Sequence, residues 1–304
     1  MSSEKKFDIF RMLFSILIAV AVSFVLILVV SKQPLEAIAA LVTGPLKGKR
    51  NFANVIEATI PLIFTGTGVC IMFSANQINL AAEGAFHLGG MIASVCVLGL
   101  SLPAGVNIVT ALLMSAAAGA VFTGIPAFLK IKTGSSEMVS SLMLNYLSLW
   151  FCTYILMHFI LDPAVGSASY QLPKSSQLMT LFRGTRVHTG LIIALIVAIS
   201  GYIFLYKTKA GYELRLAGEN QTFARYAGIS IVKVILLSQL IGGAIAGLGG
   251  GIEMLSPIYS RFSWTSLLGY GWDAIVICTL AKKNPLKTPL AAFFLAYLRT
   301  GASI

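Results

Sequence analysis

The stretch "INLAAEGAFHLGG", Ile78 to Gly90, lies between two long apolar runs and contains Asn79, Glu83 and His87. These three polar residues are four positions apart, so on a helix they share one face. The flanking runs have the length of about 20 apolar residues that a helix needs to span a bilayer. The sequence therefore places an amide, a carboxylate and an imidazole between membrane-spanning segments.

The composition supports a membrane location for the whole chain. Of the 304 residues, 57% are hydrophobic and 11% are charged, and the mean hydropathy is +0.86. A soluble domain has about 25% charged residues. So few charges cannot cover a globule in water, and the chain is predicted to be an integral membrane protein.

Apolar runs predict an all-α polytopic bundle of about 9–10 spanning helices in a single transmembrane domain, residues 1–304. The first run, Met12–Val30, is too long for a signal peptide and has no cleavage site, so it is predicted to be retained. Segment 34–43 is too short to span and is expected to lie along the membrane surface. The predicted spans are 12–31, 54–73, 83–100, 104–128, 138–160, 190–206, 231–253, 267–281 and 288–300.

Basic residues indicate the orientation rather than a nucleic-acid site. The net charge is +11, but Lys and Arg gather at the ends of apolar runs. If the N-terminus is cytoplasmic and each run crosses once, 13 of the 22 Lys and Arg residues lie inside and nine outside. The chain then ends outside with "YLRTGASI", so that either the sequence is truncated or a last helix is missing.

Two polar segments stand out between the spans. The external segment 161–189 is rich in Ser, Gly and Pro and is either a docking loop or a solvated connector. The cytoplasmic segment 207–229 is predicted to fold as a helical knuckle. Asn220 would cap its short helix and Gly228 would end it, while Gly211 and Gly218 would break the segment before the cap.

Small residues predict close helix packing in "IGGAIAGLGGGIE", Ile241 to Glu253. Gly243, Gly247 and Gly251 recur every four residues, which lets helix backbones approach each other closely. Four cysteines, Cys70, Cys96, Cys152 and Cys278, lie inside apolar runs and are interpreted as packing residues.

Carboxylates are placed at membrane depth, where a charge costs roughly 2.5–3.5 kcal/mol or more. They should therefore face protein or a water-filled path. Of Glu57, Glu83, Glu253 and Asp273, we expect Glu83 and Asp273 to lie deepest.

No motif of an enzyme or a metal site is found in the sequence. The string "GPLKGKR" has one residue too few between its glycines for a phosphate-binding loop and Arg where Ser or Thr belongs. There is no catalytic nucleophile motif and no metal-ligand cluster, so the chain is predicted to be neither an enzyme nor a metal-binding protein.

Four strings resemble permease subunits of the ATP-binding-cassette (ABC) importers for branched-chain amino acids, simple sugars and nucleosides, with the bacterial guanosine-type branch as the nearest. They are "FSANQINLAAEG", "EMVSSLMLNYL", "AGYELRLAGENQTFARYAGI" and "GYGWDAIVICTLAKKNPL", which together cover most of residues 55–290. Leu80, Ala81 and Ala85 depart from the family's usual isoleucine, glycine and glutamine, and the family's final apolar segment is absent.

The resemblance implies partners in a bacterial cell membrane. These are a second homologous permease, commonly a different chain, a cytoplasmic ATPase that holds ATP and Mg²⁺, and an extracytoplasmic binding lipoprotein. This chain itself would bind no cofactor and would contact membrane lipid but no nucleic acid. The resemblance assigns ATPase coupling to the knuckle residues Gly211, Gly218, Glu219, Asn220, Arg225 and Gly228.

The polar residues at membrane depth then receive two interpretations. Asn79, Glu83, Asn145 and Asp273 either line the path of a nucleoside or sugar, or Asn79 and Glu83 tie two helices together. Two other classes of function remain as alternatives. One is a proton-coupled secondary transporter using Glu83 and His87, and the other is a membrane scaffold that transports nothing.

Overall fold

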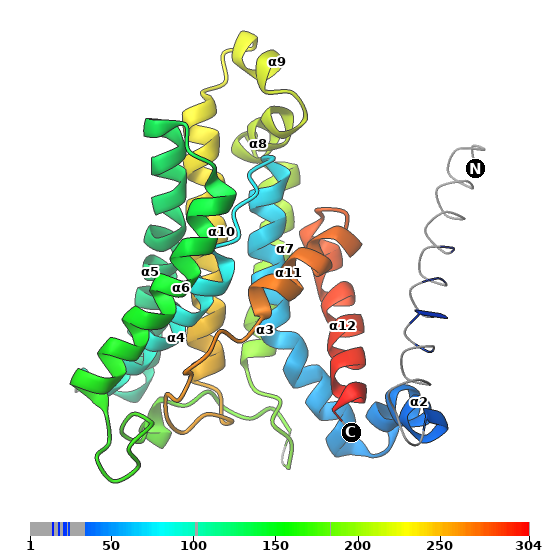
Figure 1. Ribbon diagram of the computed structural model, residues 1–304, viewed down its shortest axis with the longest axis vertical. Coiled ribbons are helices and arrows are strands. Elements are labelled where there is room, and N and C mark those ends of the chain that lie inside the picture. The colour runs from blue at the N-terminus through cyan, green and yellow to red at the C-terminus, as the bar shows by residue number, and fades with distance from the viewer. Residues whose placement is uncertain are drawn as a thin grey trace. The chain divides into compact units, whose positions relative to one another are not determined.

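The computed structural model describes residues 34–100, 103–182 and 184–303, together with positions 14, 18, 21, 22 and 24 (Figure 1). The predicted first span, 12–31, lies outside the described residues except at those five positions. The described residues contain no β-strand, only two isolated bridges, Leu161–Ser169 and Thr180–His188. The helices are α2 (Pro34–Thr43), α3 (Lys49–Ser74), α4 (Ala82–Gly99), α5 (Ala104–Thr133), α6 (Glu137–Ile155), α7 (Gly190–Lys207), α8 (Lys209–Glu219), α9 (Gln221–Tyr226), α10 (Ile231–Met254), α11 (Tyr270–Leu280) and α12 (Thr288–Ala302).

Among the described residues, six helices are long and apolar enough to cross a membrane: α3, α4, α5, α6 with its short continuation to Ile160, α7 and α10. The predicted spans 267–281 and 288–300 are helices of only 11 and 15 residues. At 1.5 Å per residue these reach about 16 and 22 Å, against a hydrocarbon core of about 30 Å. Helix α11 is therefore shorter than the span predicted at 267–281, because the length of its apolar run does not show where the helix begins.

The chain divides into two compact units. In the described part of the smaller one, α2 packs on the end of α12: Tyr297 donates a hydrogen bond to the carbonyl of Val42, and a Cβ on Gly301 would lie 2.3 Å from the Leu41 carbonyl oxygen. The larger unit, Ala53–Ala296, contains the six long helices, the predicted knuckle and the polar residues at membrane depth. The rest of the description concerns this unit.

Helix α10 lies between α4 and α5, and its glycines make this possible. A Cβ on Gly247 would lie 2.4 Å from the carbonyl oxygen of Ser115 in α5, and Gly243 and Gly251 face the same helix. On another side of α10, a Cβ on Gly250 would lie 1.8 Å from the carbonyl oxygen of Phe86 in α4. Glycine at these positions lets backbones meet without intervening side chains.

Helices α4 and α11 both begin inside the bundle rather than at its ends (Figure 1). The chain leaves the end of α3, beside α8, and runs as the non-helical segment 75–81 to the start of α4. At the opposite end of the bundle, the chain leaves α10 and runs through the non-helical segment 255–269 to the start of α11. Helices α4 and α11, which we call the interrupted helices because each begins inside the bundle after a non-helical segment, thus start close to each other at mid-depth.

Segment 161–189, which is predicted to be external, is folded against residues 255–262. Leu172 N–H donates to the carbonyl of Ser260 over 2.8 Å, and Ser169 N–H donates to that of Phe262 over 2.9 Å. Arg261 makes an ion pair with Asp162 at 2.5 Å. Because this segment is bonded to the chain that leads into α11, it is more than a solvated connector, and its docking role stays a prediction.

Candidate functional site

The two interrupted helices meet in what we name the junction, comprising residues 79–84 at the start of α4 and 269–273 at the start of α11. Helix starts carry N–H groups without intrahelical partners, and lipid supplies none. Asn145, which bonds to this region, lies eight residues into α6, about 12 Å from its first residue. The junction therefore lies near the middle of a hydrocarbon core of about 30 Å.

One face of α6 supplies the hydrogen bonds that the interrupted backbone lacks at the start of α4. Asn145 Oδ1 accepts from Gly84 N–H at 2.9 Å, and its Nδ2 donates to the Leu80 carbonyl at 2.9 Å. Ser141 accepts from Leu80 N–H at 3.0 Å, and Ser148 donates to the Gly84 carbonyl at 2.9 Å. Asn145 is buried and both ends of its amide are occupied by backbone.

Glu83 joins the start of α4 to the start of α11. Its Oε1 accepts from Gly269 N–H at 2.7 Å, and its Oε2 accepts from Gly271 N–H. The side chain is only 2% exposed. A carboxylate at a helix N-terminus is stabilised by the free N–H groups and by the helix dipole. Glu83 thus caps a helix that begins 187 residues further along the chain, at Tyr270.

Asn79 fixes the chain just before α4. Its Oδ1 accepts from Ala81 N–H at 2.7 Å, and its Nδ2 donates to Gln239 Oε1 of α10 and to the Thr123 carbonyl of α5. Asn79 and Gln239 are both fully buried. The arrangement favours the second interpretation of Asn79 and Glu83, a tie between helices, because their polar atoms are already bonded within the chain.

The hydrogen bonds around Asn79 continue toward the end of the bundle that carries α8 and α9, and the sequence did not predict this continuation. Gln239 Nε2 donates to Glu137 Oε2 at 3.2 Å, and Lys130 donates to the same oxygen at 2.7 Å and to Gln77 Oε1 at 2.6 Å. A signal for part of it exists in the sequence. Polar residues at positions 137, 141, 145 and 148 recur every three or four residues, so they mark one polar face of α6.

Asp273 and His87 are two further polar residues predicted at membrane depth. Asp273 is half-buried in the first turn of α11, where the helix dipole favours its negative charge. His87 is buried, and its Nε2 lies 3.2 Å from the carbonyl oxygen of Trp264. Among the residues that the structure describes, Glu83 is bonded to α11 and not to His87.

The knuckle consists of α8 and α9, which project from one end of the bundle (Figure 1). Asn220 Oδ1 accepts from Phe223 N–H at 2.9 Å and caps α9, as predicted. Gly228 adopts φ +79° at the other end, a left-handed conformation that favours glycine and ends the helix as predicted. Tyr226 at the tip is 89% exposed.

The predicted breaks at Gly211 and Gly218 are wrong, because both residues lie inside α8. A Cβ on Gly218 would lie 2.1 Å from the Ser74 carbonyl oxygen at the end of α3, and one on Gly211 would lie 2.0 Å from that of Phe204 in α7. The glycines let α8 pack tightly on the membrane helices. A displacement of α8 would therefore act directly on α3, whose end leads into the junction.

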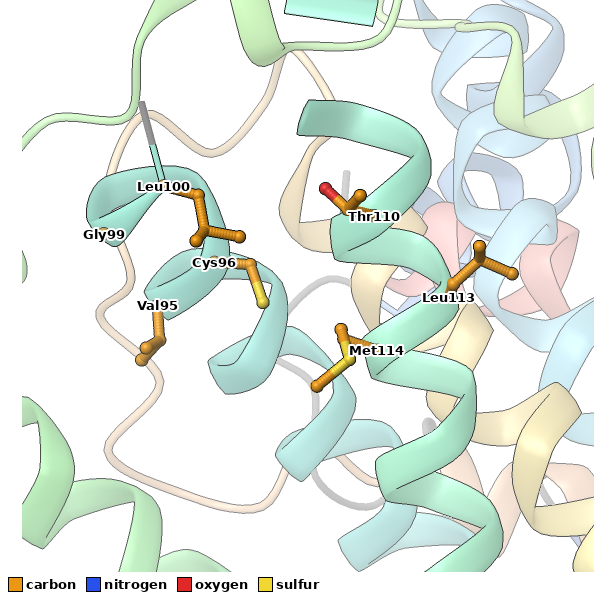
Figure 2. A pocket seen from close by; sticks show the side chains of 7 residues that line it. All are labelled: Val95, Cys96, Gly99, Leu100, Thr110, Leu113 and Met114. Carbon is orange, nitrogen blue, oxygen red and sulfur yellow. The ribbon is translucent and has the colours of Figure 1, made fainter. Parts of the chain in front are cut away.

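An apolar groove of about 570 Å³ opens between the end of α4 and the beginning of α5 (Figure 2). Its lining includes Val95, Leu100, Leu113 and Met114, while the hydroxyl of Thr110 already bonds to its own helix. Such a lining offers no hydrogen-bond partner to a polar solute. It suits the apolar chains of the bilayer instead.

Comparison with known proteins agrees with this architecture. Residues 51–304 match the family model described as "Branched-chain amino acid transport system / permease component". The chain is 30% identical to a glucose ABC transporter permease of Haloferax volcanii, over 95% of this chain and 79% of the relative. No solved structure matches the chain.

Two different relatives come from Bacillus subtilis, and both are named guanosine ABC transporter permeases. NupP is 30% identical over 95% of this chain and 84% of its own length. NupQ is 26% identical over 81% of this chain and 81% of its own length. This chain is thus similar to both permeases that carry the guanosine name in that organism.

Proposed function

This chain belongs to the family of permease components of branched-chain amino acid transport systems, and on that premise we propose that it forms the translocation path of an ABC importer for a nucleoside or simple sugar. It is a multi-pass protein of the cell membrane, with six helices long enough to cross it in the part of the chain that the structure describes. The observation that carries the proposal is the joint presence of a membrane bundle with interrupted helices and a capped, exposed knuckle at one end.

Its partners are the other parts of such an importer. A cytoplasmic ATPase binds the knuckle and supplies the ATP and Mg²⁺, while this chain binds no cofactor. A second, different permease completes the path, which the similarity to both NupP and NupQ supports. A binding lipoprotein delivers the solute to the external side, where segment 161–189 is bonded to the chain that leads into α11.

On this proposal, the junction connects the cytoplasmic end of the importer with its external end. The ATPase moves α8, and α8 packs through Gly218 on the last turn of α3. The chain continues from there through Asn79 to Glu83, which holds the start of α11. On this proposal Asn79, Glu83 and Asn145 position the interrupted helices, and Asp273, half-buried at the start of α11, remains the candidate for contact with solute.

Nothing in the site favours the proton-coupled alternative. A relay needs Glu83 and His87 to exchange a proton, but each is bonded to a different part of segment 264–271. Membership of the ABC permease family supports a partner ATPase as the energy source.

The test of the proposed function is uptake of radiolabelled guanosine and glucose by cells that express the complete importer. We expect uptake of one of the two solutes to depend on this chain and to stop when the partner ATPase is deleted. Uptake that continues without any ATPase would support the secondary transporter, and no effect of deleting this chain on either solute would support the scaffold.

The knuckle is tested by replacing Tyr226 with Ala. Because this side chain is 89% exposed, the substitution leaves the fold intact, but it should weaken co-purification of the ATPase. The matched control is Tyr146→Ala, which removes a 61% exposed tyrosine from the membrane-facing side of α6. Equal recovery of the ATPase with both variants would contradict binding at the knuckle.

A further inference from the structure

The segment that leads into α11 alternates between buried and exposed side chains. Phe262 and Trp264 are buried, whereas Ser263, Thr265 and Ser266 are exposed. From Phe262 to Thr265 this alternation has the period of two of an extended chain with one face against protein, and Ser266, also exposed, follows directly. The buried face is aromatic: the rings of Trp264 and Phe86 are stacked with their centres 5.8 Å apart. The exposed face is formed by hydroxyl groups.

Contacts with α4 place this segment deep in the membrane. The carbonyl of Trp264 lies 3.2 Å from His87 Nε2, and Gly269 N–H donates to Glu83. The segment therefore runs along the first two turns of α4. From His87 to the end of α4 at Gly99 are 12 residues, about 18 Å of helix. The exposed hydroxyls lie at about that distance from the external end of α4.

The polar groups on this exposed face have no partner in the part of the chain that the structure describes. The hydroxyl, N–H and carbonyl groups of Ser263, Thr265 and Ser266 make no hydrogen bond to another described residue. Non-helical backbone at membrane depth is tolerated only where it is buried in protein or lines a water-filled cavity. These residues are exposed, so lipid cannot be what covers them.

The neighbouring face of α11 shows a different chemistry. Its exposed residues Trp272, Val276 and Leu280 are apolar and are spaced by four, as expected of a helix face against lipid or another subunit. The surface thus changes from the apolar face of α11 to the hydroxyl-bearing residues Ser263, Thr265 and Ser266. Hydroxyl groups can donate and accept, which suits the hydroxyls of a sugar ring.

We propose that Ser263, Thr265 and Ser266 line the solute path and offer hydrogen bonds to the sugar ring of the transported solute, whether a free sugar or the ribose of a nucleoside. This inference rests on the proposed function and adds to it the residues that contact solute. It assigns solute contact to the exposed segment before α11, whereas Asn79, Glu83 and Asn145 hold the helices that surround it.

The test uses single cysteines in the complete importer. Thr265→Cys and, as a second variant, Ser263→Cys are made in a Cys96→Ser background, because Cys70, Cys152 and Cys278 are buried. The matched control is Leu147→Cys. Leu147 is 61% exposed on α6 and lies between Asn145 and Ser148, which bond to the start of α4, so it has a similar depth but faces lipid.

A charged, water-soluble thiol reagent should label the Thr265→Cys and Ser263→Cys variants at least 10-fold faster than the Leu147→Cys variant, and labelling should block uptake. Guanosine or glucose, whichever is taken up, should slow the labelling. In the natural background, Thr265→Ala should raise the KM for that solute roughly 2- to 10-fold, as expected for the loss of one hydrogen bond. Comparing guanosine with glucose distinguishes the ribose from the free sugar.

Labelling of the Thr265→Cys and Ser263→Cys variants no faster than that of Leu147→Cys would overturn the inference, as would fast labelling that neither solute slows. Cross-linking of the Thr265→Cys variant to the second permease without labelling would assign the hydroxyls to a subunit interface and would also overturn it. Labelling rates do not require uptake. An importer that takes up neither solute would therefore refute the proposed function, while the labelling comparison would still decide whether a water-filled path exists here.

Discussion

Helices α9 and α11 both begin with N–H groups that donate to a side-chain oxygen, but the oxygens come from different places in the chain. In α9 the oxygen belongs to Asn220, the residue directly before the helix. In α11 it belongs to Glu83, far away in the sequence and buried at mid-depth in the membrane. Water can replace the cap of α9, whereas nothing in lipid can replace that of α11. A buried helix start therefore depends on a distant partner, and an exposed one does not.

The largest effect is expected from Glu83→Ala. It leaves the N–H groups of Gly269 and Gly271 without partners, at about 1–3 kcal/mol each, so the complex should lose about 2–6 kcal/mol of stability. The measurement is thermal unfolding of the purified importer. Glu83→Gln distinguishes the two interpretations of this residue. If uptake falls while the importer assembles normally, Glu83 lines the solute path. If uptake and assembly fall together, Glu83 holds the start of α11.

A comparable loss, about 2–6 kcal/mol, is expected from Asn145→Leu, which keeps the size of the side chain but removes both bonds to the start of α4. Asn145→Asp retains the acceptor for Gly84 and should lose less. The amount of folded importer, measured by size-exclusion chromatography, checks the order. If Asn145→Leu assembles normally but does not transport, the amide acts on solute rather than on the backbone.

Helix α7 adds a third helix start to the comparison of α9 with α11. Its cap lies outside the membrane-spanning segments and is titratable. His188 Nδ1 accepts from Gly190 N–H at 3.1 Å, and burial lowers the pKa of His188 to about 4. Its unfolded pKa is about 6.5, so as the pH falls from 6.5 to 4 the unfolded state gains a proton that the folded state does not. Stability should therefore decline through this range.

Amide hydrogen exchange at residues 180–190 measures this decline: the protection factors, which are exchange rates relative to the intrinsic rates at the same pH, should fall below pH 6. His188→Asn keeps an acceptor near the Gly190 N–H and removes the titration, so its protection factors should depend less on pH in this range. An equal pH dependence in both proteins would show that His188 does not control the start of α7.

The smallest effect is expected from Asn220→Ala, about 1 kcal/mol of local helix stability, because water can solvate the N–H groups that are left. The importer should assemble normally, with weaker stimulation of its ATPase, and Asn220→Asp should behave like the unaltered protein. A loss of stability as large as that of Glu83→Ala would contradict the conclusion that an exposed helix cap contributes less to stability than a buried one.

Local and periodic features made much of the fold predictable. Long apolar runs identified six spans because a bilayer imposes a length on every helix that crosses it. The Asn220 cap and the Gly228 stop were predictable because each acts within a few residues of itself. By contrast, the breaks predicted at Gly211 and Gly218 are not found, since a glycine that breaks a helix and one that lets two helices touch are identical in the sequence.

The sequence by itself determined that this is a helical membrane protein with buried polar groups, because hydropathy and the cost of charge in lipid act residue by residue. Only the tertiary structure decided what those groups do. Glu83 bonds to Gly271 and Asn145 to Gly84 across gaps of 188 and 61 residues, and no local pattern encodes such pairs. For the same reason, the role that we propose for Ser263, Thr265 and Ser266 depends on where the fold places their hydroxyl groups and not on a local pattern.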